Sequence, residues 1–146
     1  MSRTITETVK YLDRTTLSEG TQLSTFTNID VETAQSSLLS TIIQYFNKSN
    51  EYEITHHEHN KKEDEIYFVF DRKNGGSYKL YIYLENPGKG ALDLEFIVFH
   101  STSTQRVNGW KKKLSPSAVS KMTVEGLAGA VIMTNVIKEI KRYEGR

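Results

Sequence analysis

Three neighbouring histidines are the side chains in this sequence with the clearest capacity for chemistry. His56, His57 and His59 lie close to Glu58 and Asp64. On an extended strand, His57 and His59 point to the same side, at a spacing that can bind a metal ion. A metal site usually draws a further ligand from another segment, and the sequence offers no evident one. We therefore interpret this cluster as a solvated strand end beside a charged turn, and we predict no metal and no cofactor.

No other arrangement of residues indicates catalysis. His100 and Thr102 form one His-x-Thr pair, but the phosphoesterases that use this pair carry two copies, and this chain has one. The glycines lack the preceding strand and the following Lys-Ser/Thr of a phosphate-binding loop. The chain contains no cysteine, which excludes a thiol nucleophile and thiolate zinc sites. The sequence therefore predicts a protein that is not an enzyme.

A basic segment lies in the second half of the chain. No acidic residue occurs between Glu95 and Glu125, although the whole chain has a formal net charge of only +1. Each Lys or Arg near an anionic membrane contributes ~1 kcal/mol, and Trp prefers the headgroup layer. A solubilising loop is the alternative, and nucleic acid, which would use the same charges, is an unlikely partner. We predict binding to anionic phospholipid through Arg106, Trp110, Lys111, Lys112, Lys113 and Lys121.

Alternating apolar segments indicate the sheet that positions these residues. Large apolar side chains occupy every second position of residues 66–70, 78–84 and 92–99. The connections between them are too short for a crossover helix, so the strands are antiparallel neighbours. A further alternation over residues 52–59 adds a fourth strand. One face is predicted to be core and carries Ile66, Phe68, Phe70, Tyr78, Leu80, Ile82, Leu84, Leu92, Leu94, Phe96 and Val98.

The opposite face of the predicted sheet carries aromatic side chains and is expected to be half exposed. A row of exposed aromatic residues is unusual for a protein that acts alone as a monomer. The alternative functional hypothesis is therefore a protein-interaction module, either an adaptor or a viral or bacterial inhibitor. Its binding residues would be Tyr67, Tyr81, Tyr83, Ile97 and Phe99.

Helical periodicity precedes and follows the sheet. Asp30 can cap a first helix, and Ser115-Pro116 and Thr123 offer two later starts before an apolar C-terminal segment. Residues 1–24 have no sustained period, so we expect a loosely ordered arm with at most one short helix or edge strand. Residues 101–115 are polar and are expected to form an irregular connection.

These elements predict one α+β domain over residues 1–146. Its sheet is a four-stranded antiparallel meander, with an N-terminal and a C-terminal helix packed on one face. The sequence shows no signal peptide and no stretch of the ~20 apolar residues that span a bilayer. We therefore expect a soluble cytoplasmic protein, peripheral at the inner face of the plasma membrane if it binds lipid.

Several strings resemble the kinase-associated domain at the C-terminal end of some protein kinases. They are residues 23–30 before the first helix, 70–76 at the first hairpin, and 91–96 in the last strand. The resemblance implies a regulatory domain that binds anionic phospholipid and holds a kinase domain inactive by an intramolecular contact. The basic string departs from the family pattern because it follows the last strand. Ubiquitin-conjugating domains also place a helix before a four-stranded meander, and without their cysteine this chain would again have a binding role.

Overall fold

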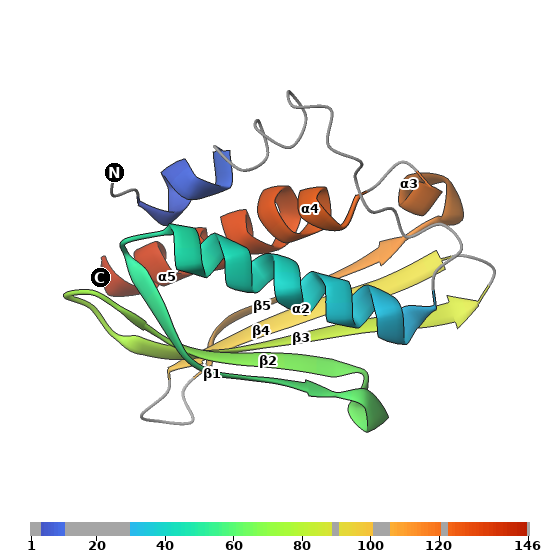
Figure 1. Ribbon diagram of the computed structural model, residues 1–146, viewed down its shortest axis with the longest axis horizontal. Helices are drawn as coiled ribbons and strands as arrows, with labels where there is room; N and C mark the ends of the chain where they lie inside the picture. Colours follow the sequence, from blue (N-terminus) through green and yellow to red (C-terminus); the bar gives the residue numbers. More distant parts are fainter. Residues whose placement is uncertain (1–3, 11–29, 89–90, 101–105, 121–122, 146) are drawn as a thin grey trace.

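The computed structural model describes residues 4–10, 30–88, 91–100, 106–120 and 123–145. Within these residues, five strands form one antiparallel sheet in the order of the sequence. All described helices that pack on the sheet lie on the same face of it (Figure 1). The predicted α+β architecture is confirmed. The strands are β1 (Tyr52–Asn60), β2 (Glu65–Arg72), β3 (Ser77–Gly88), β4 (Ala91–His100) and β5 (Arg106–Leu114).

The helices begin where the sequence predicts them. Asp30 Oδ1 accepts a hydrogen bond from the backbone N–H of Thr33 at 2.7 Å, and Ser115 and Thr123 cap the later helices in the same way. No helix in the described part of the chain is long and apolar enough to cross a membrane. The helical segments are α2 (Val31–Lys48), the short η1 (Lys61–Glu63), α3 (Pro116–Ser120), α4 (Val124–Gly126), the π-helical η2 (Leu127–Met133) and α5 (Thr134–Glu144).

The core lies between α2, the C-terminal helices and the inner face of the sheet. Every side chain predicted to face inward from the meander is buried, and none is more than 6% exposed. Phe46 of α2 packs against Phe70 with a ring distance of 4.8 Å and against Tyr52 at 6.0 Å. The aromatic cluster therefore joins the first helix to the first strands.

The fifth strand corrects the prediction of four strands. Residues 106–114, expected in an irregular connection, pair with β4 along their length. Of the β5 side chains that the structure describes, those of residues 109–114, Trp110 and Leu114 lie opposite core residues of β4 and pack inward themselves. With so few apolar residues, an edge strand gives little alternation for a sequence pattern to detect. A lysine-rich edge also discourages further strand pairing.

The predicted N-terminal arm is partly helical. Residues 5–10 form a helix whose Ile5 and Val9 are buried in the core. The carboxylate of Glu51 accepts a hydrogen bond from the backbone N–H of Ile5 at 3.2 Å. The short helix that we allowed for in this arm is therefore present, but it is packed into the core and is not loose. Residues 11–24 lie outside the described part of the chain.

Gln35 is a buried polar residue between α2 and the sheet. Its Nε2 donates to the carbonyl oxygen of Leu84 at 2.7 Å and to Asp64 Oδ1 at 3.1 Å. Replacing Gln35 by leucine leaves that buried carbonyl without its donor, so we expect unfolding free energy to fall by about 2 kcal/mol. Urea unfolding measures the loss. The exposed Gln44→Leu on the same helix is the matched control, and an equal loss in both variants would contradict this role.

Candidate protein-binding face

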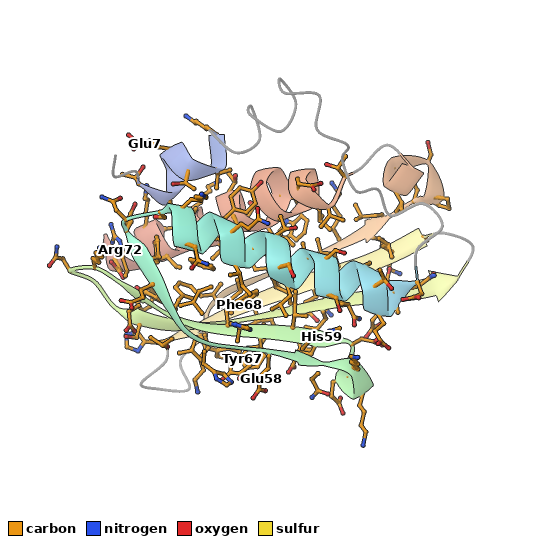
Figure 2. All side chains as sticks on the ribbon, in the orientation of Figure 1. Glu7, Glu58, His59, Tyr67, Phe68 and Arg72 are labelled. Atoms are coloured by element: carbon orange, nitrogen blue, oxygen red, sulfur yellow. The ribbon has the colours of Figure 1, made fainter. Side chains whose placement is uncertain are left out.

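The outer face is the side of the sheet that points away from the helices. We use the name for the surface formed by Tyr67, Val69, Lys79, Tyr81, Tyr83, Glu65, Glu95, Ile97 and Phe99. In Figure 2, Tyr67 and Glu58 lie on this side of the sheet, whereas Phe68 points toward α2. No described element covers the outer face (Figure 1). The sequence prediction that these aromatic side chains share one half-exposed face is confirmed.

An apolar row crosses the middle of the outer face. Tyr67 of β2 lies opposite Tyr81 of β3, which lies opposite Ile97 of β4. The two tyrosine rings stack at 4.9 Å with an angle of 20° between them. Phe99 meets the Tyr81 ring edge-on at 5.8 Å. Because the rings support one another, the row is a fixed apolar surface, of the kind that protein interfaces use.

Charged side chains flank this row in an ordered way. On one side, Lys79 is half-buried near the start of β3, and none of the described residues forms an ion pair with it. On the other side, Tyr83 has Glu65 and Glu95 as its cross-strand neighbours. Burial, followed by its hydrogen bond to Glu65, raises the pKa of Tyr83. The phenol therefore stays neutral at physiological pH and does not add to the negative charge of this side.

The predicted lipid-binding residues separate onto two faces of β5. Trp110 stacks on the core residue Phe96 with a ring distance of 5.6 Å, and Lys112 follows the same side of the sheet because it lies opposite Leu94. Lys111 lies on the outer face. Its Nζ is 3.6 Å from Glu95 Oε2. Trp110, Lys111 and Lys112 therefore do not form one surface.

Of the remaining predicted lipid-binding residues, Lys113 is the one whose side chain the structure describes. Lys113 lies opposite Asp93 of β4, so a carboxylate faces it across the strand pair. Of Arg106 the structure describes the backbone, and Lys121 lies outside the described residues. A groove of about 260 Å³ opens beside the lysines, and its lining mixes both signs of charge. It is lined by Tyr83, Glu85, Asp93, Leu94, Glu95, Lys111, Lys112 and Lys113.

The histidine cluster is divided between the faces of β1. A bulge at Thr55 shifts the register, so that His57 and His59 lie opposite core residues of β2. His59 bonds to Gln35 Oε1 at 2.8 Å, whereas His56 turns to the outer face and bonds to Glu58 at 2.9 Å. Among the described residues, no group of three or more His, Asp or Glu side chains could hold a metal ion.

The alternation along β3 puts Lys79 on the outer face, but the sequence alone gives it no role. Its position opposite Phe99 and beside the aromatic row depends on the cross-strand register. That register cannot be predicted from one lysine in an alternating strand. The alternation shows which face of the sheet a residue lies on, but not which residues of the adjacent strands lie beside it. The two hairpin turns were the only available signal for pairing.

Comparisons with known proteins give no relative for this chain. No family model matches it, and neither the curated proteins nor the solved structures contain a match. The resemblance to the kinase-associated domain therefore stays a prediction.

Proposed function

We propose that this protein is a non-catalytic interaction module that binds another protein through its outer face. The observation that carries the proposal is the stacked row formed by Tyr67, Tyr81, Ile97 and Phe99, which no described element covers. Monomeric soluble proteins rarely expose a continuous apolar surface of this kind without a use for it. Tyrosine is also among the residues that contribute most to binding energy at protein interfaces.

The geometry favours a protein partner over a phospholipid membrane. A membrane surface needs several cations that face the same way, together with an aromatic side chain that is free to enter the headgroup layer. Here Trp110 packs on Phe96, while Lys111 lies near Glu95. Lipid binding and the intramolecular kinase contact remain predictions, and both are less well supported than binding by the outer face.

Site-specific photo-crosslinking in the source cells tests the proposal. A photoreactive phenylalanine analogue at Ile97 is expected to form an adduct with a defined protein, because this side chain lies in the middle of the apolar row. The same analogue at Gln44, which is exposed on α2, is the control for chance encounters. The additional change Tyr81→Arg is expected to reduce the Ile97 adduct at least about tenfold, since it puts a charge into the row.

The proposal is judged by the difference in adduct yield between Ile97 and Gln44. Adducts of equal yield from Ile97 and Gln44, or no adduct from Ile97, would remove the basis for a binding role of the outer face. Mass spectrometry of the adduct identifies the contacting peptide of the partner. An adduct unaffected by Tyr81→Arg would show that the apolar row does not make the contact.

A further inference from the structure

The outer face has a charge pattern that is complementary to itself. The apolar row through Tyr81 separates Lys79 on one side from Glu65 and Glu95 on the other. These three residues occupy the central strands, where an ion buried in an interface needs a partner. Lys79 is half-buried and forms no ion pair with any described residue. Glu95 has a cation near it on its own chain, the 77% exposed Lys111 at 3.6 Å. The half-buried cation on one side of the row matches the carboxylates on the other side.

We propose that the partner of the outer face is a second copy of this chain, so this inference rests on the proposed function. The two sheets pack face to face about a two-fold axis that runs across the strands and passes through Tyr81. Each apolar row then covers the same row of the other copy, as in any isologous interface. The ammonium group of Lys79 in one copy lies above Tyr83 of the other, between its Glu65 and Glu95.

The charges select this axis over the alternative. A two-fold axis parallel to the strands through β3 also stacks the apolar rows, but it places Lys79 against Lys79. It further brings Glu65 of one copy over Glu95 of the other. Like charges that face each other in an interface strongly weaken the association. In the proposed arrangement Glu58 faces Glu58 at the β1 edge, where each carboxylate is 59% exposed and already bonded to His56. At the opposite edge the 77% exposed Lys111 faces the backbone position of Arg106.

The size of the outer face fits a stable dimer. Five strands at the usual spacing are about 24 Å wide, and a nine-residue strand such as β1 or β5 is about 30 Å long. The face therefore offers about 700 Å² to a partner, close to the ~800 Å² per partner of a standard interface. Two sheets packed face to face keep their strand directions within about 30°, which leaves the rows in contact.

The inference is tested by reversing single charges on the outer face and measuring the oligomeric state of the full chain by analytical ultracentrifugation. The wild type is expected to sediment as a dimer. Lys79→Glu places three carboxylates together at each contact, and Glu65→Lys places two ammonium groups together, so each variant alone is expected to weaken the dimer at least about tenfold. An equimolar mixture of the two is expected to recover association, because each variant supplies the charge that the other lacks. Lys138→Glu on α5, on the far side of the sheet, is the control and is expected to leave the dimer unchanged.

Three results would overturn the inference: a wild type that is monomeric at every concentration, single variants that associate like the wild type, or a mixture that does not recover. Circular dichroism checks that each variant is folded, and Glu95→Lys replaces Glu65→Lys if the latter fails that check. The photo-crosslinking result separates this inference from the proposed function. If the chain is monomeric and the Ile97 adduct contains a different protein, the second copy is excluded as the partner, and the proposal that the outer face binds a protein stands.

Discussion

Replacing Phe46 by alanine is expected to lower the unfolding free energy by about 3–5 kcal/mol, the usual range for a fully buried phenylalanine. Phe46 is 2% exposed. Its ring contacts Tyr52 and Phe70 at 6.0 and 4.8 Å, and Phe68 at 6.1 Å. These neighbours come from two strands, so the cavity left by the substitution cannot close by the shift of a single element. Equilibrium unfolding in urea measures the loss directly.

Phe99→Ala is the matched control, because it removes the same atoms from the outer face. Phe99 is only partly buried, and its ring meets Tyr81 edge-on. We expect a smaller loss in the monomer, about 1–2 kcal/mol, since Phe99 keeps part of its surface in water and its removal leaves no enclosed cavity. The substitution should be measured at a concentration too low for association. Losses of equal size in the two variants would mean that the outer face supports the fold in the same way as the core.

The inner face of the sheet could be predicted from sequence because its signal is strong. In β2, β3 and β4 a large apolar side chain recurs at every second residue, and the hairpin glycines fix which strands are neighbours. The start of α2 at Asp30 was equally readable, since an aspartate before a helical repeat has a clear physical role as a cap.

The rest of the fold depends on contacts that no local pattern carries. Among the described side chains of β5, Trp110 and Leu114 pack into the core, whereas Lys111, Lys112 and Lys113 are exposed. The bulge at Thr55 exchanges the faces of all later residues in β1, and it has no glycine to mark it. In the sequence, Gln35 cannot be told from an exposed polar residue of the helix. In the structure it is buried, and it donates hydrogen bonds to Leu84 of β3 and to Asp64, the C-cap of η1.

In the candidate site, too, the alternating pattern predicted the face of each residue but not which residues are neighbours. The five residues proposed for protein binding were correctly assigned to one face, because face is a matter of alternation. The basic residues were grouped because they are close in sequence. In a strand, adjacent residues point to opposite sides. Lys111 therefore faces away from Trp110 and Lys112, although the three are consecutive in the sequence.

Replacing Glu144 by alanine is expected to cost about 2–3 kcal/mol, because it removes the acceptor of a largely buried network. Its carboxylate, near the end of α5, accepts hydrogen bonds from the Arg72 guanidinium and the Tyr78 hydroxyl. It also accepts from the backbone N–H of Gly76 at 3.1 Å. The side chain is 19% exposed. Without it, the β2–β3 hairpin loses its attachment to the C-terminal helix.

Glu144 also predicts how stability depends on pH. Burial raises the pKa of its carboxyl, but the hydrogen bonds from Tyr78, Gly76 and Arg72 together lower the pKa by more than burial raises it. The net pKa therefore lies below the ordinary value of 4.5. The unfolded state therefore binds the proton more readily than the folded state in this range. The contribution of Glu144 is complete above its unfolded pKa and is lost as pH falls through the lower folded pKa.

Comparison of the wild type with Glu144→Gln isolates this charge. The glutamine keeps the shape of the side chain, so the difference in unfolding free energy between the two proteins is expected to be largest near neutral pH and to shrink in acid. Urea unfolding over a series of pH values measures that difference. Glu139→Gln removes a charge of the same sign from the same helix, where its partner Arg142 is exposed, and is expected to change stability little at any pH. A difference between wild type and Glu144→Gln that stays constant down to acid pH would mean that the network is held by shape and not by the ionised carboxylate.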